Sequence, residues 1–239
     1  NISTTNKGTY RKTMTVYYQQ QQANRYLTKI EQLLDPNAVL AGGAPRDWFF
    51  NRNAKDLDIF VYLGEQNKKP SYWKQKLEEA GFKVSAIKNK YGPKDGMFAQ
   101  CFEWTKDIFA RCKLTKSTNQ EDYILSMNPY LECVVDIEVE PGENPVQIMI
   151  MNQPVDQCTY TKFPVSISQI WYKNGKFNKT PDFLVGTKHN IIYPTGIDNS
   201  MDGKYTKKVR EKFPEFEYLD SKDKVIHFLS DKLSSTPYR

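Results

Sequence analysis

The spacing of hydrophobic and polar positions predicts the first helices and strands of the chain. Apolar residues recur at helical spacing over 23–34, which predicts an amphipathic helix packed on a sheet. The Gln run at 19–22 is expected to be the solvated start of this helix, and the polar residues 1–22 a loose arm. Short apolar runs at 39–41 and 57–63 predict two strands joined through a glycine turn and a short helix.

The second half of the chain also contains segments with helical spacing and segments with strand alternation. The segments 131–139 and 145–151 alternate apolar and polar residues around a Pro-Gly turn, which predicts a hairpin. Further helices are predicted at 71–80, 203–213 and 221–233, and further strands at 82–87 and 188–193. Together these elements predict an α/β fold: a mixed sheet with flanking helices and a small helical C-terminal part. We expect a polar arm (1–22), a main domain (23–195) and a helical appendage (196–239).

Composition narrows the class of protein. The 239 residues include 15 Tyr and 13 Phe, which is typical of a folded chain. The formal net charge of +6 is compatible with a nucleotide or nucleic-acid partner without requiring one. No apolar run approaches the roughly 20 residues that span a bilayer, so no membrane partner is expected. Four scattered cysteines without a Cys-x-x-Cys pair argue against a zinc site and predict reduced thiols in a cytoplasmic protein.

Candidate chemistry is concentrated between residues 39 and 63. Asp56 and Asp58 are two apart, so on a strand they project from the same face. Paired carboxylates repel unless a cation lies between them, and their hard oxygen atoms suit Mg²⁺. Gly42 and Gly43 allow an unusual turn and a close approach of phosphate to the backbone, and Pro45 suits the first turn of a helix. The alternative is a plain glycine turn followed by a strand with two solvent-facing aspartates.

The same residues resemble the signature of the DNA polymerase β-like nucleotidyltransferases, in particular the tRNA CCA-adding enzymes and bacterial poly(A) polymerases. That signature runs Gly-Gly-x-x-Arg-Asp, a short helix, a turn, and Asp-x-Asp. Here it is matched by residues 42–47, 51–52 and 56–58. The resemblance implies that Gly42 and Gly43 hold the phosphates of a nucleoside triphosphate and that Asp56 and Asp58 bind metal ions. Arg46, with the neighbouring Asp47, is expected to brace the loop or touch the nucleotide.

The resemblance also implies a third carboxylate on a strand beside the Asp-x-Asp strand. Asp136 and Glu138 are the candidates offered by the alternation of 131–139, and we take Asp136 as the third catalytic residue. The alternative is that both belong to the solvated face of an antiparallel strand. The implied activity is Mg²⁺- or Mn²⁺-dependent transfer of a nucleoside monophosphate from an NTP to a hydroxyl, with two metal ions held by the carboxylates.

A second stretch, 161–183, departs from the pattern it resembles. CCA-adding enzymes carry Arg-Asp-Phe there, whereas this chain has Lys162, Phe163 and Pro164, so an acidic residue is missing. One alternative is therefore a fold without catalysis that binds a nucleotide, RNA or a protein. Short chains of this kind also resemble the predicted nucleotidyltransferases of tailed bacteriophages, which would place the protein in the host cytoplasm or the virion.

The acceptor is expected to be RNA, such as a tRNA end. The predicted helix 203–213 carries five basic residues, at 204, 207, 208, 210 and 212, which suit phosphate contacts. The alternative is an ordinary solvated helix face. The predicted C-terminal part is too short for the long helical domains of CCA-adding enzymes, which argues against a full CCA-adding role.

Overall fold

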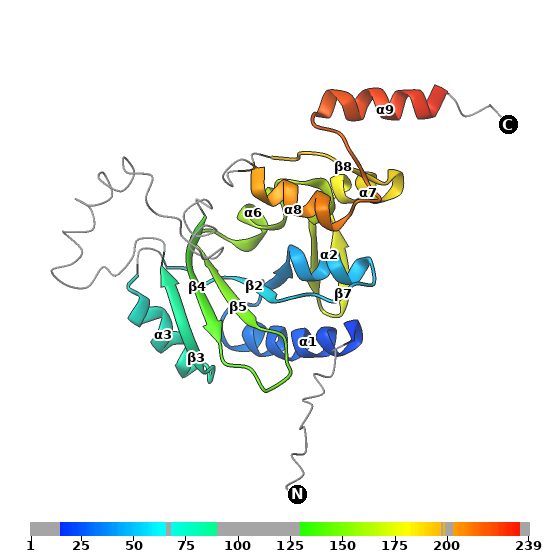
Figure 1. Ribbon diagram of the computed structural model, residues 1–239. Helices are drawn as coiled ribbons and strands as arrows, with labels where there is room; N and C mark the ends of the chain where they lie inside the picture. The colour runs from blue at the N-terminus through cyan, green and yellow to red at the C-terminus, as the bar shows by residue number, and fades with distance from the viewer. Residues whose placement is uncertain (1–14, 66–67, 90–129, 197, 199–202, 235–239) are drawn as a thin grey trace, which may run out of the picture.

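A seven-stranded mixed sheet forms the centre of the molecule (Figure 1). The computed structural model describes residues 15–65, 68–89, 130–196, 198 and 203–234, so residues 1–14 of the predicted arm lie outside it. The strand order is β3-β4-β5-β2-β1-β6-β7. The strands are β1 (Val39–Ala41), β2 (Leu57–Tyr62), β3 (Val84–Asn89), β4 (Leu131–Ile137), β5 (Val146–Met151), β6 (Ile170–Lys173) and β7 (Lys176–Lys179).

The pairing of the strands confirms the prediction of a mixed sheet. β2 runs parallel to β5, and every other neighbouring pair in this sheet is antiparallel. The predicted hairpin is present as β4 and β5. Because β5 lies between them, the hairpin strand β4 is not the direct neighbour of β2.

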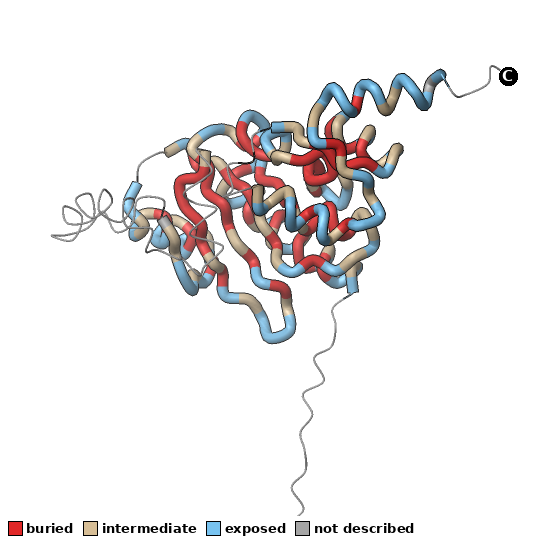
Figure 2. The backbone as a smooth tube through the Cα atoms, turned by 45° about the horizontal axis from the view of Figure 1, so that its top comes forward, coloured by how far each residue is buried: buried red, intermediate tan, exposed pale blue. Residues whose placement is uncertain are grey.

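Helices α1 (Val16–Leu33) and α3 (Pro70–Glu79) pack on one face of the sheet. Ile30 of α1 and Trp73 of α3 are fully buried in one cluster with Leu57 and Ile59 of β2. The opposite face carries a second apolar cluster, to which the short helix α6 (Val155–Cys158) contributes. Figure 2 shows buried residues concentrated along the central strands, while the β4–β5 turn is exposed. No described helix is both long and apolar enough to cross a membrane.

The Gln run is solvated only in part, whereas the prediction made all of it solvated: Gln21 is exposed. Helix α1 starts at Val16, and Gln19 and Gln22 are buried on its inner side. Gln19 accepts hydrogen bonds from the Trp48 indole at 2.7 Å and the Ala54 amide at 2.9 Å. Gln22 exchanges two hydrogen bonds with the backbone of Asn144. These amides are buried because their polar atoms find partners that lie far away in the sequence.

The C-terminal third has an apolar cluster of its own, which joins α8 to η2 and β8. Val165 and Ile192 contact Val209 and Phe213 within this cluster. The strand predicted at 188–193 is shorter, because Asn190 takes a left-handed conformation that ends helix α7. The remaining elements are η1 (Tyr160–Lys162), η2 (Ser166–Ser168), α7 (Pro181–His189), β8 (Ile191–Ile192), α8 (Lys204–Lys212), β9 (Glu217–Tyr218) and α9 (Lys222–Ser234). Helix α9 stands away from the sheet in Figure 1.

Candidate active site

The glycine turn lies between β1 and α2 (Gly43–Phe49) and depends on Gly42. Gly42 has φ 80° and ψ −118°, a conformation that L-residues with a side chain rarely adopt. A Cβ atom at this position would lie 2.9 Å from Cζ of Phe163. Gly43 is less constrained, since a Cβ there would meet only Nη2 of Arg46 at 4.0 Å. The turn therefore requires glycine at position 42 for both conformation and space.

Asp56 and Asp58 lie at the start of β2, next to this turn. The antiparallel register pairs Leu40 with Ile59, and continuing it by one residue sets Ala41 opposite Asp58. Leu57 and Ile59 are fully buried on the other face, so the strand alternation turns Asp58 away from the main core. Both aspartates are half-buried.

The two carboxylates act on each other. Burial and, less strongly, the negative charge of Asp56 raise the pKa of Asp58 to about 7, and the ammonium of Lys208 opposes the shift. Burial and a neighbouring negative charge both disfavour the ionised form of a carboxylate. A positive ion placed between them would relieve this repulsion, which is the electrostatic behaviour expected of a cation site.

Asp136 lies two strands away from Asp58. The register places Gln147 of β5 beside Asp58, and Asp136 of β4 beside Gln147. Two strand spacings correspond to a backbone separation of about 10 Å. The Asp136 carboxylate accepts a hydrogen bond from Gln147 at 2.8 Å and pairs with Lys88 at 3.3 Å. The described ranges contain no group of three His, Cys, Asp or Glu residues that could hold a metal ion, and the role of Asp136 stays a prediction.

Arg46 and Asp47 form a buried ion pair on α2. The Arg46 guanidinium donates two hydrogen bonds to Asp47 Oδ1, at 3.1 and 3.2 Å, and one to Ser168 Oγ at 3.1 Å. Lys212 of α8 donates to the other carboxylate oxygen of Asp47. Arg46 thus fastens α2 to η2, and Asp47 fastens it to α8. A contact between Arg46 and a nucleotide stays a prediction.

Helix α8 reaches the aspartate pair, which the sequence did not predict. Loss of water around its ammonium lowers the pKa of Lys208, although the side chain as a whole is exposed, and the charge of Asp56 opposes this shift. Tyr205, on the same helix, is within electrostatic range of Arg46, Asp47 and Asp58. The sequence did contain one indication that these side chains lie together. Positions 205, 208 and 212 are three and four residues apart, so they share one face of the helix.

Phe163 lies in the stretch 162–164, where the sequence lacks the acidic residue of the resembled motif. Its ring lies over Gly42 and makes an edge contact with Phe60, at 6.1 Å between centroids. The side-chain amide of Gln169 holds this segment by donating to the carbonyl of Phe163 at 3.1 Å and that of Thr161 at 3.2 Å. The segment closes over the glycine turn with an aromatic ring instead of a carboxylate.

The structure is similar to solved CCA-adding enzymes. An apo form of one such enzyme is 9% identical, with a TM-score of 0.48, and the match covers 92% of this chain and 46% of that chain. A CCA-adding enzyme with CTP is 10% identical, with a TM-score of 0.47 and the same coverages. One with ATP is 9% identical, with a TM-score of 0.48, covering 89% of this chain and 41% of that chain. No family model and no curated protein matches the chain.

This chain spans less than half the length of those solved chains. Similarity at this level concerns the fold and carries no information about activity, substrate or partner. These structures give no support to the expected bacteriophage origin.

Proposed function

We propose that this protein is a divalent-metal-dependent nucleotidyltransferase that moves a nucleoside monophosphate from an NTP to a hydroxyl acceptor. The observation that carries the proposal is the position of Asp56 and Asp58 at the N-terminal end of β2 beside the Gly42 turn, where burial and, less strongly, the charge of Asp56 raise the pKa of Asp58 to about 7. Two aspartates exposed to water on an ordinary strand would not have a pKa raised in this way. A carboxylate pair held in this way suits a positive ion.

The donor set fits Mg²⁺ or Mn²⁺. Magnesium is usually bound by one or two carboxylates together with waters and the phosphates of the substrate, so a site with two aspartates is sufficient. Bound divalent ions would supply activation of the acceptor oxygen and charge stabilisation of the leaving phosphate. In this proposal Asp56 and Asp58 hold the ions, and Gly42 and Gly43 let the triphosphate approach the backbone. Arg46 keeps the loop in place and lies within reach of the nucleotide.

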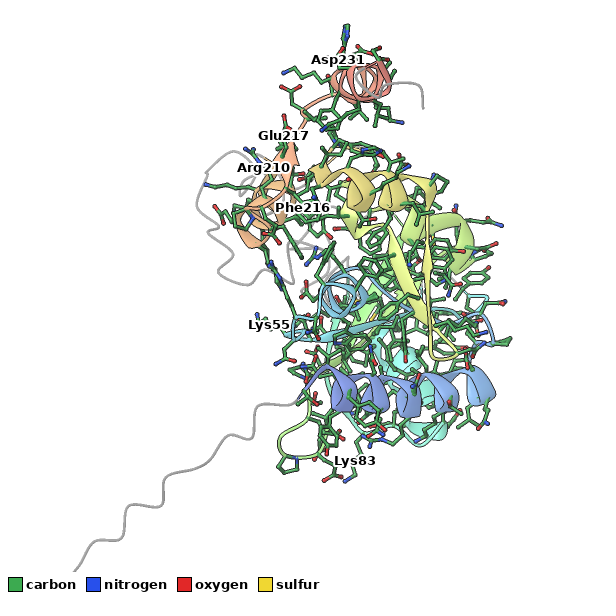
Figure 3. All side chains as sticks on the ribbon, turned by 90° about the vertical axis from the view of Figure 1, so that its right-hand side faces the viewer. Lys55, Lys83, Arg210, Phe216, Glu217 and Asp231 are labelled. Atoms are coloured by element: carbon green, nitrogen blue, oxygen red, sulfur yellow. The ribbon has the colours of Figure 1, made fainter. Side chains whose placement is uncertain are left out.

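We propose an RNA end, such as that of a tRNA, as the acceptor. Lys207 and Arg210 are exposed on α8, the helix that reaches the aspartate pair. Figure 3 shows Arg210 on the same side of the molecule as Lys55, which precedes Asp56. A strand bound along this side by its phosphates would have its end near the carboxylates. Action in the cytoplasm is part of the same proposal.

Incorporation of labelled nucleotide tests the activity. Each of the four NTPs, labelled at the α-phosphate, is incubated with the protein, Mg²⁺ or Mn²⁺, and total cellular RNA. We expect incorporation by the wild-type protein, and its loss in Asp58→Asn and Asp56→Ala. Asp223→Asn, an exposed carboxylate on α9, is the matched control and should retain activity. Incorporation that persists in Asp58→Asn would refute the assignment, provided that the variant shows a cooperative thermal transition.

The same assay tests Asp136. If Asp136 binds a metal ion, Asp136→Asn should lose nucleotide incorporation, as Asp58→Asn should. Full activity in Asp136→Asn would leave the carboxylate as the partner of Gln147 and Lys88 alone.

A second candidate function is binding without turnover. It is favoured by the stretch 162–164, which lacks the acidic residue of the resembled motif and sets the Phe163 ring against Gly42 instead. It predicts that the wild-type protein binds NTPs but incorporates none with any acceptor or metal. Nucleotide binding measured by equilibrium dialysis, alongside the incorporation assay, separates the two functions.

A further inference from the structure

A hollow lies between helix α8 and the segment that leads from it into β9. Its volume is about 470 Å³, which is within the usual range for a ligand site. Its walls combine cationic, acidic and aromatic side chains: Lys207, Arg210, Glu211, Pro214, Phe216 and Tyr218. Figure 3 shows Arg210 and Phe216 on the side of the molecule that also carries Lys55. The hollow shares no lining residue with the Gly42 turn, yet it lies on the same side as the residue that precedes Asp56.

Both walls of the hollow are held by the core beneath them. On α8, Val209 is buried in the cluster that also contains Phe213. Phe216 makes an edge contact with Phe213, at 6.0 Å between ring centroids. Tyr218 lies in β9, which pairs with β8. The hollow is thus already formed in the free protein, so little ordering cost opposes the binding of a ligand.

The aromatic wall carries a stacked cation. The guanidinium carbon of Arg210 lies 4.1 Å from the centroid of the Tyr218 ring, which is a cation–π contact. Arg210 is nevertheless exposed, and within the described ranges it has no hydrogen bond or ion pair. A planar guanidinium that rests on a ring and stays exposed provides a platform on which an unpaired nucleic-acid base can stack.

The charges of the hollow favour a base inside it and phosphates at its edge. Lys207 is three residues before Arg210, so the two cations project from the same side of α8. The exposed carboxylate of Glu211 also borders the hollow, and it repels a phosphate group placed inside. A flat, uncharged base avoids that repulsion, while the phosphates on either side of it can contact the two cations. One carboxylate with two cations therefore suits a single RNA strand better than a free triphosphate, whose charges are concentrated at one place.

We propose that this hollow binds an unpaired base of the RNA acceptor, stacked on Arg210 and Tyr218, with a neighbouring phosphate on Lys207. This inference rests on the proposed function, and it adds that the acceptor is recognised as a single strand at α8 and β9. Bases within a duplex are stacked and paired with one another, so they cannot enter the hollow unless the duplex opens. Binding should depend on the ring of Tyr218, and on the plane of the Arg210 guanidinium in addition to its charge.

Binding of labelled RNA to the protein, measured by fluorescence anisotropy without NTP, tests this inference. A short single strand is compared with a duplex of the same length. Tyr218→Leu removes the ring but keeps an apolar side chain, and Arg210→Lys removes the planar group but keeps the charge. We expect each variant to bind the single strand about tenfold more weakly, because one stacked base is lost, and to bind the duplex as the wild type does. The salt dependence of the affinity should stay the same in both variants, since no positive charge is removed.

The matched controls are Tyr17→Leu and Arg25→Lys, which change two exposed side chains of α1 outside the hollow. Both should bind RNA as the wild-type protein does. Because Arg210 is exposed, Arg210→Lys should leave the melting temperature unchanged, so this variant tests the inference even if Tyr218→Leu does not fold.

The outcomes are separable from those of the transfer assay. Wild-type affinity in Arg210→Lys, or in folded Tyr218→Leu, would overturn the inference and leave the transfer activity standing. Equal losses for single strand and duplex would also overturn it, since they indicate a charged surface without a stacked base. No RNA binding by the wild-type protein would overturn both the inference and the RNA acceptor. Binding to single strands that depends on both side chains, without incorporation of nucleotide, would uphold the inference and refute the transfer activity alone.

Discussion

Lys212 donates a hydrogen bond to the buried carboxylate of Asp47, which lies 165 residues earlier in the chain. The pair joins α8 to the helix that follows the glycine turn. Arg52 adds a second connection by donating to the Lys212 carbonyl and pairing with Glu215 at 2.6 Å. Helix α8 is thereby attached to α2, the helix of the candidate site.

Removing Lys212 should destabilise the fold. In Lys212→Ala, Asp47 keeps its ion pair with Arg46, but its second carboxylate oxygen loses its partner. That oxygen remains buried. We expect the free energy of unfolding to fall by about 1–3 kcal/mol, measured by urea denaturation. Lys224→Ala is the control, because it removes an exposed ion pair with Asp220 and should cost less than about 0.5 kcal/mol. Equal effects of the two changes would contradict the importance of the buried pair.

The two glycines should respond differently to alanine. Gly42→Ala forces a side chain into a left-handed conformation and against the Phe163 ring, so we expect a loss of about 1–3 kcal/mol. Gly43→Ala meets open space at a helical position and should leave stability unchanged or slightly raised. Thermal unfolding of both variants measures the contrast. A melting temperature of Gly42→Ala equal to that of Gly43→Ala would show that the turn has been described incorrectly.

Stability should depend on pH through Asp58. Its pKa is about 7 in the folded state and near 3.8 when unfolded, so the folded state binds more protons between these values. The resulting stabilisation is fully present below about pH 4 and is lost as the pH rises through 7. Asp58→Asn removes the effect, and we expect the variant to gain about 1–3 kcal/mol on the wild type at pH 8 and almost nothing at pH 4.

Added Mg²⁺ should reduce this difference at pH 8, since a bound cation stabilises the charged wild-type site. Thermal unfolding at both pH values, with and without Mg²⁺, measures it. A constant difference between wild type and variant across pH would contradict the raised pKa.

RNA binding should respond to salt. If RNA phosphates contact α8, the logarithm of the binding constant should fall linearly with the logarithm of the salt concentration, by about 0.7 per contact for single strands. The double variant Lys207→Glu, Arg210→Glu should flatten that slope, whereas Lys222→Glu on α9 should leave it unchanged. Filter binding over a salt series gives the slopes. An affinity independent of salt would point to a protein or small-molecule acceptor.

Features that depend only on neighbouring residues could be predicted from the sequence. The alternation of 131–151 predicted the β4–β5 hairpin, and the apolar run at 57–63 predicted β2. A common face of Asp56 and Asp58 stays a prediction, since Asp56 precedes β2. The positive φ of Gly42 is likewise a property of one turn, whereas the lack of space for a side chain there depends on Phe163.

Contacts between residues far apart in the sequence became visible in the folded molecule alone. It inserted β5 between β2 and β4, so that Gln147 and not Asp136 lies beside Asp58. It buried Gln19, and it brought Lys212 to Asp47 from a helix whose composition indicated only a basic surface. Such contacts depend on how the whole core packs. The spacing of apolar residues within one helix or strand does not predict them.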